Sequence, residues 1–145
     1  MRHRFLLLPL LAMLAPASAN ACSIYVPRPQ TPAEQRAGAR AAVEHAAAII
    51  DGEVIRPFVR GGPPALVRVH RRFKGPQQAE FEVGELTSCD TALTAVGERS
   101  RMLLYGGPDV YFIRMGIVSA RAVDRLLGSD RRRDWPYVAG TTAPQ

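Results

Sequence analysis

Apolar and polar residues alternate in short runs after residue 46, and glycine and proline separate these runs. Runs of ten residues or fewer that are bounded by turn formers are typical of β-strands rather than helices. The pattern therefore predicts a mainly β protein with five strands. We place these strands at residues 47–55, 65–73, 79–86, 100–105 and 110–119.

The second and third predicted strands can be paired in register as a hairpin. A three-residue loop at 74–76 leaves apolar side chains on the inner face and opposite charges on the outer face, where facing charges stabilise a ladder. A slip of one residue would turn glutamates into the core. The predicted inner pairs are Val69 with Phe81 and Val67 with Val83, and the outer pairs are His70 with Glu80 and Arg68 with Glu82.

A helix is predicted before the first strand. Thr31 is a helix cap, Pro32 suits the first turn, and Glu34 completes a capping box three residues after the cap. An alanine-rich stretch then continues to residue 48. Its expected shallow face, which we place against a sheet, consists of Ala37, Ala41, Glu44 and Ala48.

A short second helix is predicted after the last strand, capped by Ser119 and stopped by Gly128. Five antiparallel strands between two helices predict a small closed barrel. Residues 22–128 then form one domain, and residues 129–145 form a polar tail.

Residues 1–21 have the pattern of a secretory signal peptide. Arg2 and Arg4 precede an apolar run that is shorter than the roughly 20 residues needed to span a bilayer. Small residues allow cleavage after Ala19 or after Ala21. We therefore expect an exported protein, periplasmic or secreted, without a membrane span.

The net charge of the chain is modest and does not alter the prediction of an exported barrel domain. The chain carries 19 basic and 13 acidic residues, a formal charge of +6, and removing the two arginines of the signal leaves 17 − 13 = +4. Aromatic residues do not interleave with the basic ones along the strands, as they do on single-stranded nucleic-acid surfaces. Nucleic acid is therefore not the predicted partner.

Cys22 and Cys89 are the only cysteines. Two cysteines in an exported chain suggest one disulfide, because the compartment is oxidising. Cleavage after Ala21 would make Cys22 the first residue, which leaves lipid attachment and metal chelation open as alternatives. Lipid attachment is disfavoured because Ala19 and Asn20 do not fit the signal that it requires.

No metal or catalytic site is predicted. A zinc site needs three or four converging ligands, and His45 and His70 are the only histidines after the signal. Asp51 and Glu53 flank Gly52, where a bulge is favoured over an acid and base pair. No cofactor is expected.

Three short motifs occur in order along the predicted strands: Lys74-Gly75 ends the second, Ser88-Cys89 follows the third, and Gly97 precedes the fourth. This order, behind a signal that ends at a cysteine, resembles the netrin-like family of OB-fold domains, which includes the tissue inhibitors of metalloproteinases. In bacterial members of that kind, the same residues stand at these places. The resemblance covers roughly residues 22–127.

The resemblance implies an OB-fold whose N-terminal segment is tied to the barrel by a Cys22 to Cys89 disulfide. In the inhibitors, the amine and carbonyl of the N-terminal cysteine chelate the protease zinc, and the next side chain enters the specificity pocket. Those roles would fall to Cys22 and Ser23. This chain departs from the animal inhibitors, which begin Cys-x-Cys.

The predicted function is therefore non-enzymatic binding of an unknown envelope or extracellular protein by a monomer. Metalloprotease inhibition through Cys22 is one alternative. A small envelope hydrolase or metal enzyme that uses Asp51, Glu53 or His70 is the other.

Overall fold

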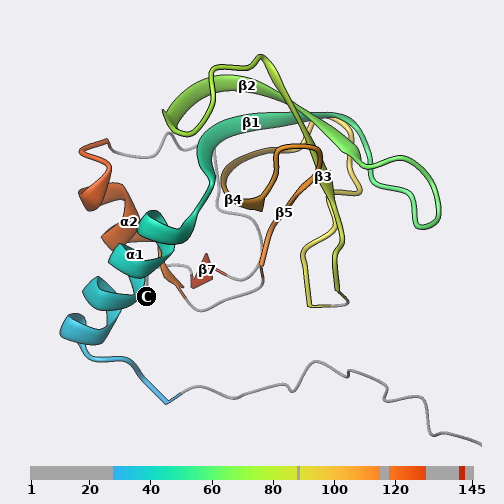
Figure 1. The fold of residues 1–145 in the computed structure, drawn as a ribbon. Helices are drawn as coiled ribbons and strands as arrows, with labels where there is room; N and C mark the ends of the chain where they lie inside the picture. The colour runs from blue at the N-terminus through green and yellow to red at the C-terminus, as the bar shows by residue number, and fades with distance from the viewer. Residues whose placement is uncertain (1–27, 88, 115–117, 130–140, 143–145) are drawn as a thin grey trace, which may run out of the picture.

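Five strands form a closed barrel in the computed structural model, which describes residues 28–87, 89–114, 118–129 and 141–142. The strand order is β1-β2-β3-β5-β4, and β4 pairs back onto β1 (Figure 1). This mainly β architecture with two helices is OB-fold-like, as predicted. The strands are β1 (Ala48–Arg56), β2 (Ala65–Lys74), β3 (Glu80–Gly84), β4 (Arg99–Gly106) and β5 (Tyr111–Phe112).

The barrel is mixed, so the prediction of an all-antiparallel barrel was wrong. β3 and β5 run parallel, with Val83 paired to Tyr111, and the other seams are antiparallel. Five strands in a closed ring cannot alternate in direction all the way round, because the number is odd. At least one seam must therefore be parallel.

The fifth predicted strand was also too long. β5 holds only two residues, and β6 (Val118–Ser119) pairs instead with β7 (Thr141–Thr142) in a separate parallel ladder. The predicted signal peptide at 1–21 and most of the predicted tail at 129–145 lie outside the described residues.

The β2–β3 register differs from the prediction by two residues. Val67 pairs with Phe81, and Arg68 pairs with Glu80. The β2–β3 ladder ends at Arg68 and Glu80, while β2 continues along β1 to Lys74, so the connection before β3 is longer than the predicted three residues. A shift of two keeps each side chain on its face, and Val67, Phe81 and Val83 are indeed buried.

The predicted helix caps are confirmed. α1 (Pro32–His45) begins with a reciprocal capping box, in which the Thr31 N–H donates to Glu34 Oε2 at 2.8 Å. α2 (Ala120–Leu126) is capped by Ser119, and Gly128 follows it with φ of 59°. α1 ends earlier than predicted because Ala46 is extended.

The predicted buried face of α1 was wrong. Ala39 and Ala42 are buried, whereas Ala37 and Ala41 are exposed. The reason is that α1 packs mainly against α2 and β6 rather than flat on the sheet. Both helices lie on one side of the barrel (Figure 1).

Two apolar clusters follow from this arrangement. One fills the barrel, where Phe81 meets Tyr111 edge to face with ring centres 4.9 Å apart. The other lies between the outer barrel surface and the helices. Its buried members are Ala39, Ala42, Ala46, Ile49, Leu103, Ala122 and Val123.

The Lys74-Gly75 motif joins the barrel to α1. Lys74 Nζ donates to the carbonyl oxygens of Val43 at 2.8 Å and Glu44 at 2.6 Å, near the end of the helix. A cation there satisfies carbonyls that have no partner within the helix. Gly75 has φ of 102°, and a Cβ on it would lie 2.6 Å from the Ala48 Cβ, so glycine is required.

The capping box makes a pH-dependent contribution to stability. Hydrogen bonds from Arg28 and then from Thr31 lower the pKa of Glu34 from 4.5 to about 2. Because the folded pKa is the lower one, this contribution is present above pH 4.5 and is lost as the pH falls towards 2. We expect Glu34→Gln to lower the melting temperature at neutral pH and the difference to shrink in acid. A difference that is the same at both pH values would contradict this account.

Candidate functional site

The predicted disulfide and the predicted inhibitory edge are only partly covered by the structure. Cys22 and Ser23 lie outside the described residues, so the pairing of Cys22 with Cys89 and the inhibitory roles stay predictions. Cys89 is half-buried in the connection between β3 and β4, and it is not a free thiol.

A buried carboxylate shapes the chain around Cys89. Asp90, only 8% exposed, accepts hydrogen bonds at Oδ2 from the backbone N–H groups of Leu86 at 2.8 Å and Thr87 at 2.7 Å. The Cys89 N–H donates to Thr87 Oγ1 at 3.2 Å. We call Leu86, Thr87, Cys89 and Asp90 the Cys89 loop. Charge-assisted bonds of this kind hold a loop in one conformation.

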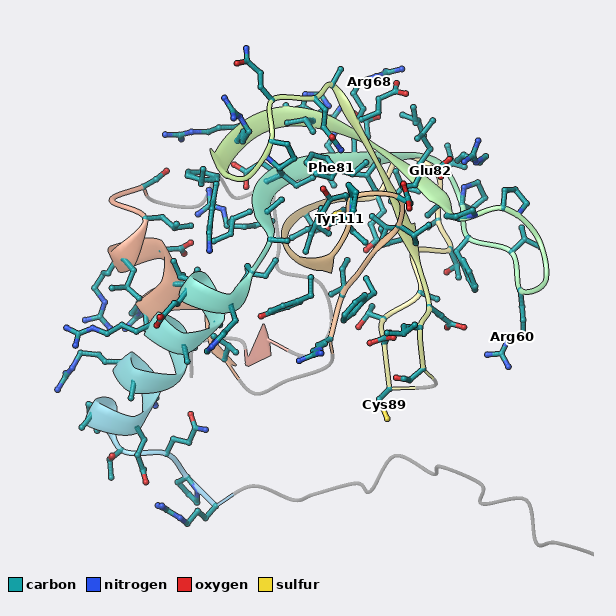
Figure 2. The ribbon with its side chains drawn as sticks, viewed as in Figure 1. Arg60, Arg68, Phe81, Glu82, Cys89 and Tyr111 are labelled. Carbon is teal, nitrogen blue, oxygen red and sulfur yellow. The ribbon has the colours of Figure 1, made fainter. Side chains whose placement is uncertain are left out.

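The base of the Cys89 loop is fastened to the barrel. Asp90 forms a β-bridge with Arg114, and the Thr91 N–H donates to the Ile113 carbonyl at 2.8 Å. Leu93 is buried in the barrel core. Figure 2 shows Cys89 at the far end of this connection, away from the barrel.

The Cys89 loop also exposes a large apolar side chain. Leu86 is 72% exposed, more than any other large apolar side chain of the described residues. Burial of a leucine side chain is worth about 1.5 to 3 kcal/mol, so a partner that covers Leu86 would gain from the contact. The bond from its backbone N–H to Asp90 fixes the backbone that carries it.

A second cluster, missed by sequence reasoning, is centred on Arg101. Its side chain is fully buried, and it forms two bonds with Asp51, Nε to Oδ1 at 2.7 Å and Nη2 to Oδ2 at 3.0 Å. Nη1 bonds Asp124 of α2 at 2.6 Å. The guanidinium also lies 4.3 Å from the centre of the Phe73 ring. Arg101 thus fastens α2 to the barrel.

The only sequence signal for this cluster was an arginine inside the apolar run 100–105. Alternation places its side chain on the outer barrel face, which strand-level reasoning treats as solvated. Only the packing of α2 reveals that this position is buried.

Asp51, Glu53 and His70 do not converge on one point. The Asp51 carboxylate is engaged by Arg101, whereas Glu53 Oε2 lies 3.0 Å from His70 Nε2 and 3.2 Å from Arg99 Nε. His70 therefore faces Glu53. The predicted partner of His70 was Glu80, so this prediction was wrong.

His70 does not face Glu80 because the β2–β3 register differs from the prediction by two residues, which places Arg68 opposite Glu80. The β1–β2 register also shifts between Asp51 and Gly52, where it skips His70. The irregularity predicted at Asp51-Gly52 is present, but the extra residue is His70, so the bulge lies in β2 and not in β1. Gly52 is needed there, since a Cβ on it would lie 2.5 Å from Val67 Cγ1. Within the residues that the structure covers, no three potential metal ligands lie together.

Comparisons with protein-family models, with curated proteins and with solved structures gave no match to this chain. The structure places the chain in the class of small OB-fold-like barrels with a fastened, exposed loop. Membership of the netrin-like family rests on the residue resemblance and stays a hypothesis. Among the described helices, none has the length and apolar character to cross a membrane.

Proposed function

We propose that this chain is an exported binding domain that engages an envelope or extracellular protein through the Cys89 loop. The observation that carries the proposal is Leu86, which is 72% exposed on a loop held by Asp90. A rigid apolar side chain at a surface is a good binding anchor, because little conformational freedom is lost when a partner covers it.

A disulfide from Cys22 to Cys89 would bring the N-terminal segment to the same edge. That Cys89 is not a free thiol supports this pairing. The two cysteines would then join the segment after the signal to the Cys89 loop, and together they would form one binding edge. Asp51 and Glu53 were the acids considered for catalysis. Both are held in ion pairs with arginines, and this favours the binding role over acid and base catalysis by these two residues.

The test is capture of a partner from envelope extract by the purified protein, with Leu86→Ser as the variant. We expect the captured partner to bind Leu86→Ser at least about thirty-fold more weakly, which corresponds to the roughly 2 kcal/mol that defines a hot-spot residue. Leu126→Ser is the matched control. Leu126 is also exposed, at 44%, and it belongs to α2, which lies at the left in Figure 2, whereas Cys89 lies below the barrel. Equal binding by both variants, or no specific partner, would refute the proposal.

Metalloprotease inhibition is the second candidate, favoured by the exposed Leu86 next to the cysteine that would hold Cys22. It requires a free amine on Cys22. N-terminal sequencing of the exported protein decides this point, because a chain that starts at Asn20 has that amine in a peptide bond. A chain that starts at Cys22 but leaves zinc proteases fully active would also exclude inhibition while leaving the binding proposal standing.

A further inference from the structure

The two helices carry four exposed arginines that have no acidic partner. Arg36 and Arg40 lie one turn apart on α1, and Arg121 and Arg125 lie one turn apart on α2. None of them forms an ion pair with any residue that the structure describes. Six arginines elsewhere in the described residues are paired with acids: Arg28, Arg56, Arg60, Arg68, Arg99 and Arg101. Arg71, Arg72 and Arg114 instead contact a serine hydroxyl, a backbone carbonyl and aromatic rings.

This arrangement has a cost for folding. Like charges four residues apart on a helix repel each other and destabilise it, and here two such pairs lie on neighbouring helices. Unpaired positive charge on both helices is therefore a feature that an anionic ligand would relieve.

An open pocket lies between these side chains. Its volume is about 120 Å³, and it is lined by Arg36, Arg40 and Arg125, with Ala122 and Leu126 as its apolar part. Leu126 is 44% exposed. The pocket is smaller than the roughly 300 to 1,000 Å³ of sites for drug-sized molecules. Its size suits a single headgroup rather than a whole nucleotide or sugar.

The chemistry of the pocket selects phosphate. A guanidinium matches the oxygens of a phosphate with two parallel hydrogen bonds. The exposed Leu126 among the arginines distinguishes a lipid from a free ion, because apolar side chains within a cationic surface enter the boundary between headgroups and acyl chains. A free phosphate ion gains nothing from that leucine.

We propose that the α1–α2 arginine surface, formed by Arg36, Arg40, Arg121, Arg125 and Leu126, binds the phosphate headgroups of an anionic membrane. Figure 2 shows the helices at the left of the view and Cys89 below the barrel, apart from the helices. The inference does not depend on the proposed binding function.

The test is co-sedimentation of the full chain with vesicles of phosphatidylcholine, with and without phosphatidylglycerol. Neutral vesicles are the reference, because the apolar run at residues 5–14 can itself bind lipid. We expect binding to the anionic vesicles to exceed this reference and to weaken with salt. The triple variant Arg36→Gln, Arg40→Gln, Arg125→Gln should lose roughly a hundred-fold in partitioning to anionic vesicles.

The control is the triple variant Arg56→Gln, Arg60→Gln, Arg68→Gln, which removes the same charge from arginines that are paired with acids. It should keep most of the anionic binding. Circular dichroism melts check that both variants are folded.

Three results would overturn the proposal. One is an equal loss in both variants, which would show a net-charge effect only. Another is equal binding to neutral and anionic vesicles. The third is a wild type that binds anionic vesicles no better than neutral ones but does bind inorganic phosphate or an oligonucleotide, with that binding lost in the triple variant of Arg36, Arg40 and Arg125.

Discussion

Arg101→Met is expected to destabilise the protein by about 3 to 5 kcal/mol, the usual cost of removing one partner from a buried ion pair. The substitution leaves the Asp51 carboxylate, 2% exposed, without the guanidinium that binds both of its oxygens. It also removes the ion pair between Arg101 and Asp124, which fastens α2 to the barrel. At about 4 °C per kcal/mol for a domain of this size, the melting temperature should fall by roughly 12 to 20 °C.

The matched control is Arg99→Met, two residues earlier on the same face of β4. Arg99 is 47% exposed and pairs with Glu53, so its removal should cost less than about 1 kcal/mol. Urea unfolding followed by circular dichroism measures both variants.

A second variant separates the stranded charge from lost packing. Adding Asp51→Leu to Arg101→Met removes the uncompensated carboxylate, so the double variant should be more stable than Arg101→Met alone. If Arg101→Met and Arg99→Met cost the same, the buried pair does not hold the helix, and this account of the cluster is wrong.

Local rules predicted the features that depend on neighbouring residues. Thr31 with Glu34, and Ser119 with Gly128, mark the helix ends because capping uses only residues within one turn. The inward faces of Val67 and Phe81 were also predicted correctly, since strand alternation determines them.

Features that depend on closure of the barrel could not be predicted in this way. The β2–β3 register differs from the prediction by two residues because the connection from Lys74 to Glu80 is longer than the predicted three-residue loop. The predicted five strands already imply one parallel seam, but its place between β3 and β5 depends on the strand order around the barrel. His70 lies beside Glu53 and not Glu80 because the register places Arg68 opposite Glu80.

The candidate site shows the same limit. Cys89 was identified from its residue type alone. The importance of Leu86 and Asp90 emerged only when the structure brought a buried carboxylate beneath two backbone N–H groups. Arg101 was missed because its burial is due to α2, a helix about twenty residues further along the chain.

Loss of the predicted Cys22 to Cys89 disulfide is the other large expected effect. The bridge would close a loop of 68 residues, counted from Cys22 to Cys89. On the chain-entropy model this stabilises the protein by roughly 4 kcal/mol, mainly by restricting the unfolded chain. Cys89→Ser should therefore lower the free energy of unfolding of the oxidised protein by about that amount in a urea titration.

The controls for this prediction come from the chemistry of the bridge. Cys22→Ser and the double variant should be as unstable as Cys89→Ser, because each lacks the same bond. Reductant should bring the wild type down to their level and leave the variants unchanged. An oxidised wild type that is no more stable than when reduced would exclude the bridge, as would an intact mass that does not rise by two hydrogens on reduction.

The structure also predicts which residues should exchange their amide hydrogens faster when the disulfide is lost. Asp90 holds the Cys89 loop through its own hydrogen bonds, and Asp90 and Thr91 are paired to Arg114 and Ile113. The loop therefore keeps its conformation without the disulfide. We expect hydrogen exchange in the Cys89→Ser variant to increase before residue 28 and to stay unchanged at Leu86 and Thr87. Faster exchange at those two amides would mean that the disulfide, and not Asp90, orders the binding edge.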